Sequence, residues 1–238
     1  MSDSTKNQEL AKDGWTAVPR AQSKILANVD KNKPAKISVD NIKLPNSDIA
    51  RKTQAYAKKE LPEKTYNHSM RVYYYGAAIV KYHFPEFESF LETYFLTCML
   101  HDIGTTETNI NATRLSFEFS GGFLALNLLQ QLGASKSQAE SVCEAIIRHQ
   151  DLGDSGNITS VGQLVQLATV FDNVGMNPTL IDKSTIDSVT EAYPRNKWTS
   201  CFAATIREEL ALKPWSHTTA IDGFAEMVEA NVLMEPWD

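Results

Sequence analysis

The stretch ETYFLTCMLHDIG, residues 92–104, is an apolar run that ends in a histidine and an aspartate, followed by a glycine two positions later. Tyr94 and Cys98 lie seven and three positions before His101, so the three residues share one face if the run is helical. Asp102 stands directly beside His101. We therefore predict a core helix that carries two polar side chains at its inner end.

Apolar residues at helical spacing recur along most of the chain. They predict helices over residues 47–60, 64–83, 88–102, 113–132, 136–150, 159–175, 184–193, 197–211 and 219–232. Four glycines lie just past helix ends, where a left-handed C-cap is expected, at positions 104, 133, 153 and 175. No segment shows sustained strand-like alternation. The prediction is an all-α fold, with a single compact multi-helix domain over residues 46–238 and an extended, largely irregular N-terminal lead-in over residues 1–45.

The composition is that of a folded soluble protein. Of the 238 residues, 42% are hydrophobic and 22% are charged, and the formal net charge is −6. This charge argues against nucleic acid or an anionic membrane as a partner. The three cysteines form no C-x-x-C pair, which argues against a disulfide framework and a cysteine zinc site. Without a signal peptide or a membrane-length apolar run, we expect a cytoplasmic protein, with the nucleus as the alternative. A homo-oligomer is compatible with this pattern.

Two further predicted helices carry a polar residue on their apolar side. In YNHSMRVYYYGAAIVKY, His68 shares a helical face with Val72 and Ile79. In VGQLVQLATVFDNVG, Asp172 follows Ala168 at one helical turn. Three different helices are therefore predicted to point a histidine or an aspartate into the core.

Together with His101 and Asp102, these residues form a set of two imidazoles and two carboxylates. For any one of them alone, a hydrogen-bonded core position is the usual explanation. An unpaired buried carboxylate is unfavourable, however, and the full set suits zinc, iron or manganese. The residues therefore favour a divalent metal site, provided that the four side chains converge.

The order of these residues on helices, His68, then His101-Asp102, then Asp172, resembles the HD superfamily of metal-dependent hydrolases. In that superfamily the four matching positions bind the metal, so the resemblance implies all four residues as ligands. More narrowly, seven segments within residues 66–218 resemble the fungal cyanamide hydratases. They are YNHSMRV, LHDIGTT, SFEFSGG, EAIIRHQD, ATVFDNVG, SCFA and KPWSHT.

This resemblance implies a hydro-lyase, in the carbon–oxygen lyase class, that adds water to the nitrile of cyanamide and produces urea. It implies a small neutral substrate, a role in detoxification and one divalent metal, Zn²⁺ in preference to Fe²⁺ or Mn²⁺. A metal-bound hydroxide would attack the nitrile carbon. Asp102 has two oxygens, so one can bind the metal while the other accepts a proton.

Two residues occupy places where HD proteins with two metals carry further histidines. Glu118, in SFEFSGG, replaces the first, which argues for a single metal and for a role in proton transfer or orientation. His149, in EAIIRHQD, matches the second, and we expect it to donate to the substrate nitrogen or to hold the water. The alternatives are a solvated helix residue for Glu118 and a helix C-terminal cap for His149.

Four more polar residues are candidates for substrate contact. Asn67 and Asn173 flank two predicted ligands, and Thr105 follows the His-Asp pair. His217 lies in a predicted loop, in KPWSHT. A helix-ending turn for Thr105 and simple packing for His217 are the alternatives.

Two rival functions remain open at this point. The first is a single-metal HD phosphohydrolase that acts on a nucleoside monophosphate. Its charged substrate would require several lysines or arginines, and the segments around the motifs supply few. The second is a non-catalytic, metal-stabilised binding module, which the complete ligand set together with Glu118 and His149 disfavours.

Overall fold

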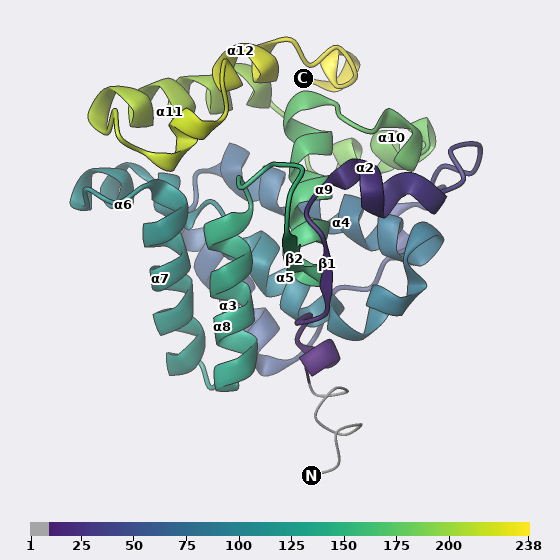
Figure 1. Cartoon of the computed structure of the whole chain (residues 1–238), viewed down its shortest axis with the longest axis horizontal. Helices are drawn as coiled ribbons and strands as arrows, with labels where there is room; N and C mark the ends of the chain where they lie inside the picture. Colours follow the sequence, from purple (N-terminus) through teal and green to yellow (C-terminus); the bar gives the residue numbers. More distant parts are fainter. Residues whose placement is uncertain (1–9) are drawn as a thin grey trace.

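The computed structural model describes residues 10–238, so residues 1–9 of the lead-in lie outside the described residues. Helices dominate the structure, and the predicted all-α fold is confirmed (Figure 1). The main body consists of α3 (Asp48–Glu60), α4 (Glu63–His83), α5 (Leu91–Leu100), α7 (Phe117–Gln131), α8 (Lys136–Arg148) and α9 (Ser160–Val174). These bounds agree closely with the predicted ranges.

The centre of the body is formed by α4, α5 and α9, which are buried along most of their length. Such helices are apolar on nearly every side because neighbouring helices surround them. Gly76 lets α4 and α5 approach closely, because a Cβ at this position would lie 1.9 Å from the hydroxyl oxygen of Tyr94. That hydroxyl donates a hydrogen bond to the Val72 carbonyl, which fixes α5 against α4.

The helix ends follow the expected chemistry in part. Ser47 caps α3 by accepting a hydrogen bond from the Ala50 amide, and Gly133 and Gly175 have the left-handed backbone of a C-cap, as predicted for these two glycines. Gly104 and Gly153 do not, so that prediction is wrong for both. Gly104 is required for a different reason: a Cβ there would lie 2.1 Å from the Phe117 carbonyl oxygen at the start of α7.

Several short elements escaped the sequence prediction. The segment before α5 is a 3₁₀ turn, η3 (Pro85–Phe90), and the segment after it contains η4 (Ile103–Thr105) and α6 (Glu107–Ala112). The lead-in contributes β1 (Ala17–Pro19), α2 (Gln22–Ile25), η1 (Leu26–Asn28) and η2 (Val39–Asn41). Strand β1 pairs antiparallel with β2 (Asn157–Thr159), so the lead-in is fixed against the body. Three residues are too few to show strand-like alternation.

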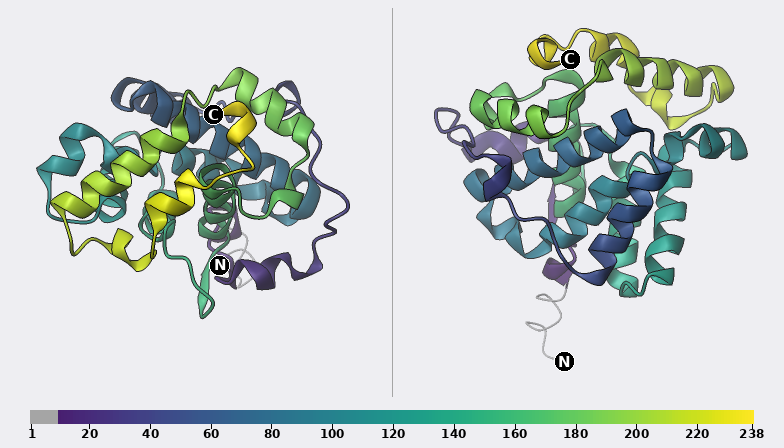
Figure 2. Two further views of the ribbon diagram at one scale, coloured as in Figure 1. Left: turned by 90° about the horizontal axis from the view of Figure 1, so that it is seen from above. Right: turned by 180° about the vertical axis from the view of Figure 1, so that it is seen from behind.

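The C-terminal part covers one end of the body. It contains η5 (Pro178–Leu180), α10 (Lys183–Ala192), α11 (Trp198–Leu212), η6 (His217–Ala220), α12 (Phe224–Glu229) and η7 (Glu235–Trp237). The two views of Figure 2 show α11 and α12 lying across the end of the bundle. They enclose a second apolar cluster that includes Trp198, Phe202 and Phe224. Within residues 10–238, no helix combines the length and the apolar character needed to cross a membrane.

Candidate metal centre

The structure brings three of the predicted ligands together at the centre of the fold. His68 projects from the first half of α4, His101 is the C-cap of α5, and Asp102 precedes η4. The Nε2 atoms of His68 and His101 are 3.2 Å apart. Asp102 Oδ2 lies 3.2 Å from His101 Nε2 and 3.6 Å from His68 Nε2. All three residues are at most 1% exposed. They form a buried group that can hold a metal ion.

The hydrogen bonds on the outer side of the two rings fix their tautomers. His101 Nδ1 donates to the Cys98 carbonyl over 2.8 Å, and His68 Nδ1 donates to Asp172 over 2.6 Å. Since a neutral imidazole carries one proton, both Nε2 atoms direct lone pairs toward each other. The carboxylate oxygens of Asp102 accept no hydrogen bond from any described residue. Lone pairs without a donor therefore converge at this point, and a divalent cation fits it.

The electrostatics of the centre keep His68 neutral and Asp102 deprotonated, which are the states that bind a metal. Burial lowers the pKa of His68 to about 4, so its ring is neutral at physiological pH. Burial works to raise the pKa of Asp102, but the neighbouring His101 and His68 hold it well below its usual range. For His101 burial is outweighed by Asp102, and the pKa is raised. These pKa shifts apply to the three residues in the absence of a bound cation.

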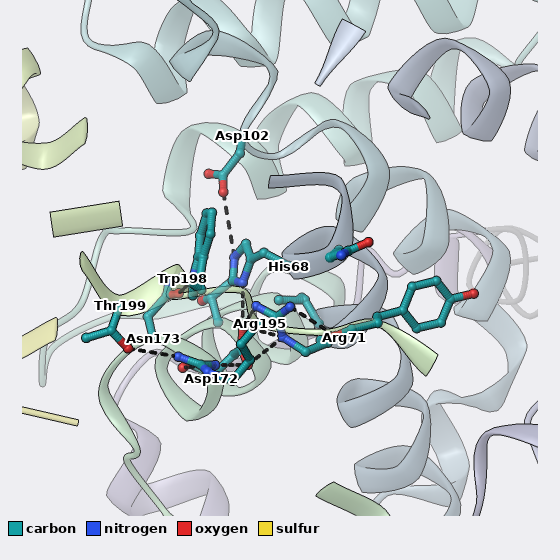
Figure 3. Close-up of polar contacts among 12 residues, drawn as sticks. His68, Arg71, Asp102, Asp172, Asn173, Arg195, Trp198 and Thr199 are labelled. Carbon is teal, nitrogen blue, oxygen red and sulfur yellow. Dashed lines mark hydrogen bonds and ion pairs between the residues drawn. The ribbon is translucent and has the colours of Figure 1, made fainter. Parts of the chain in front are cut away.

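Asp172 lies on the opposite side of His68 from Asp102, as Figure 3 shows. Its carboxylate accepts a hydrogen bond from His68 Nδ1 and ion pairs with the buried guanidinium groups of Arg71 and Arg195, over 2.9 and 2.6 Å. These two arginines outweigh burial and hold the pKa of Asp172 far below its usual range. Asp172 does not join the group formed by the other three residues. Its predicted role as a direct ligand therefore stays a prediction, while the observed contacts orient the His68 ring.

His149 supplies a further lone pair at the edge of the centre. It is the C-cap of α8, as its alternative explanation required, and it is 4% exposed. Its Nδ1 donates to the Ile146 carbonyl over 2.7 Å, which leaves Nε2 free at 3.9 Å from Asp102 Oδ1. The ring meets that of His101 edge to face, with 5.3 Å between centroids. His149 therefore both ends α8 and lies beside the metal centre.

Glu118 is fully buried in the first turn of α7, which excludes the alternative of a solvated residue. Its Oε1 accepts a hydrogen bond from His217 Nδ1 over 2.8 Å, and its Oε2 has no partner among the described residues. This hydrogen bond to the carboxylate raises the pKa of His217. The His217 backbone amide also donates to Ser116. The Glu118–His217 pair connects two predicted site residues that the sequence did not link.

A narrow cavity of about 20 Å³ lies beside His149, with room for about one water molecule. Among the four predicted substrate residues, Asn173 lines this cavity. Asn67 instead donates to the Pro194 carbonyl, and the Thr105 hydroxyl donates to the Asp102 carbonyl. His217 is occupied by Glu118. We call the cavity beside His149 the inner pocket.

Two residues that sequence reasoning missed complete the surroundings of His68. The Trp198 ring stacks on the His68 ring with 4.4 Å between centroids, and its Nε1 donates to Asn173 Oδ1. Arg195 reaches Asp172 from the turn that precedes α11. Trp198 shares a helical face with Phe202 and Ile206, a spacing that predicts its burial but not its contact with His68. Arg195 lies outside the helices, and its only signal was the pairing requirement of a buried carboxylate, which demands a cation without naming it.

A buried centre of two histidines and one aspartate, carried by a helical body, is the arrangement of a metal-dependent HD-domain protein. Residues 65–174 match the family model of the HD domain. Two curated relatives from Saccharomyces cerevisiae, Cyanamide hydratase DDI2 and Cyanamide hydratase DDI3, are each 41% identical to the chain over 226 residues. Each alignment covers 94% of this chain and 99% of the yeast protein. The chain therefore belongs to the HD-domain family and groups within it with these two hydratases, which confirms the resemblance found in the sequence.

Proposed function

We propose that this protein is a cyanamide hydratase, a hydro-lyase that converts cyanamide and water into urea. The observation that carries the proposal is the convergence of His68, His101 and the unpartnered Asp102 in a buried centre next to the small inner pocket. The identity to the two yeast hydratases over nearly the whole chain supports the same substrate.

We propose one divalent metal as the cofactor, with zinc preferred because imidazole and carboxylate donors suit it. His68 Nε2, His101 Nε2 and an Asp102 oxygen would hold the ion, and Asp172 is the predicted fourth donor. When bound, the metal would lower the pKa of a coordinated water to about 7 and polarise the nitrile. The remaining tasks fall to side chains of the chain itself.

The side chains can move the protons that hydration requires. Asp102 has a second oxygen, which can accept a proton from the attacking water. His149 Nε2 carries a free lone pair, so it can take a proton and return it to the nitrile nitrogen. The resulting isourea tautomerises to urea. Glu118 and His217, which share a hydrogen bond, can relay protons to solvent because His217 is about one-third exposed.

Substrate contact remains a proposal for all four residues predicted from the sequence. Asn173 has the strongest support because it lines the inner pocket together with His149. Asn67, Thr105 and His217 have less support, since none of them lines the inner pocket and each makes a hydrogen bond within the protein. We also propose cytoplasmic residence, with the nucleus as the alternative, since all three cysteines are unpaired. A homo-oligomer is compatible with these proposals.

The rival phosphohydrolase is disfavoured by the arginines beside the centre. Arg71 and Arg195 are both buried and both pair with Asp172, so neither is available to a phosphate. The deciding experiment measures urea release from cyanamide and phosphate release from a panel of nucleoside monophosphates, with the metal content of the purified protein determined in parallel. We expect urea release and about one metal per chain. Phosphate release without urea release would overturn the proposal.

A further inference from the structure

The metal centre is closed to solvent, so its substrate needs a path through the protein. His68, His101 and Asp102 are at most 1% exposed and His149 is 4% exposed. The inner pocket reaches His149 and Asn173, but it holds only about 20 Å³. Its lining includes the exposed side chains of Met176 and Met227, so a route into the inner pocket passes one of these two residues.

A larger space lies between the lead-in and the loops that follow α8 and α9. This outer cavity has a volume of about 700 Å³ and is bordered by residues of α2, η1 and the segment 176–180. Ser23, Ala27 and Asp154 are exposed at its rim, so it opens to solvent. Leu152 and Met176 line both the outer cavity and the inner pocket. These two side chains form the partition between them.

We propose that the outer cavity is the entrance to the metal centre and that Leu152 and Met176 form the gate between it and the inner pocket. Met176 suits this role because its side chain is unbranched, flexible and 40% exposed. It directly follows Gly175, whose left-handed backbone ends α9. The identity of the substrate in this proposal rests on the proposed function, whereas the position of the route does not.

The test changes the size of the gate. We expect Met176→Trp to lower kcat/KM for cyanamide by at least about tenfold, because a bulky ring blocks the partition. Met176→Ala should raise the rate with N-methylcyanamide relative to the rate with cyanamide, because it widens the partition. The control is Leu124→Trp, which adds the same ring at an exposed position of α7 that lines neither cavity. Metal content and melting temperature should equal those of the wild type in all three variants.

A second measurement tests the route without relying on urea formation. In the cobalt-substituted protein, binding of azide, a linear triatomic ion, is followed by visible absorbance. We expect Met176→Trp to slow azide association at least about tenfold relative to the wild type and to Leu124→Trp. Unchanged azide association together with unchanged kcat/KM in correctly folded Met176→Trp would overturn the gate. If the wild type forms no urea and Met176→Trp still slows azide association, the proposed function is overturned and the gate is kept.

Discussion

Two buried aspartates beside the same histidine have opposite surroundings. Asp172 accepts hydrogen bonds or ion pairs from His68, Arg71 and Arg195, so its charge is compensated inside the protein. Asp102 has no hydrogen-bond donor on either oxygen among the described residues. Because both of its oxygens keep their lone pairs, Asp102 is the aspartate that can offer donors to an external cation.

This contrast predicts unequal effects on stability for the two matched amide variants. In the metal-free protein, Asp102→Asn should lower the free energy of unfolding less than Asp172→Asn does, because Asp102 interacts with the neighbouring histidines but accepts no hydrogen bond from any described residue. Asp172→Asn should lower it by about 3–5 kcal/mol, because Arg71 and Arg195 lose their shared partner. Guanidinium unfolding of the metal-free proteins measures both changes. If Asp172→Asn lost the metal and kept its stability, Asp172 would act as a ligand rather than as a positioning residue.

We expect His149 to transfer protons rather than to bind the metal, so its substitution should lower the catalytic rate without changing the metal content. We predict that His149→Ala lowers kcat for urea formation by about 10²–10⁴-fold while the metal content stays the same. The reason is that Nε2 lies 3.9 Å from Asp102, whereas the three-member group without His149 can already hold the ion. Metal analysis and steady-state kinetics on one preparation make the comparison. Loss of the metal in this variant would assign His149 as a ligand instead.

At the scale of elements, the short segment η6 is docked onto the start of α7 by polar contacts. His217 Nδ1 donates to Glu118, and the Thr218 hydroxyl donates to Glu209 of α11. Glu209 also accepts from the Phe117 backbone amide over 2.7 Å. The start of α7 is thus joined through two buried carboxylates to η6 and α11, which lie far from it in the sequence.

The Glu118–His217 pair predicts a pH-dependent contribution to stability. Glu118 raises the pKa of His217, so the pair contributes most below the unfolded-state value of about 6.5 and loses that contribution as pH rises through the higher folded value. A double-mutant cycle with Glu118→Gln and His217→Gln, measured by guanidinium unfolding at several pH values, isolates the coupling. The coupling should shrink from about pH 6 toward pH 9. A coupling that grows with pH would contradict the assignment.

The same elements show how far the sequence predicts the site. Helical spacing predicts that His68, His101 and Asp172 point into the core, because a polar residue among apolar ones at that period must be buried. It does not predict which atoms meet. Arg195 approaches Asp172 from the segment before α11, where there is no periodicity. The helical spacing of Trp198 with Phe202 predicts that Trp198 is buried, but not that its ring stacks on His68. Their contacts depend on how α11 packs across the bundle, which is a property of the tertiary fold.

At the scale of the whole molecule, the metal centre joins parts of the fold that are otherwise held by apolar packing. His68 belongs to α4, His101 and Asp102 follow α5, and His149 ends α8. A cation bound among them would compensate Asp102 and link these helices at one point. Because only the folded chain assembles the complete set, binding must stabilise the folded state.

Addition of zinc to the metal-free protein should therefore raise the melting temperature in a concentration-dependent manner. When free zinc exceeds the dissociation constant about 1,000-fold, the expected gain in unfolding free energy is about 4 kcal/mol. Calorimetry across a zinc titration measures the gain, and Asp102→Asn is the control because it removes the carboxylate that can offer donors to the cation. The urea assay on the same samples separates the remaining alternatives. An enzyme gains activity in parallel with stability, whereas a non-catalytic binding module would gain stability alone, and no gain of either kind would contradict the metal centre itself.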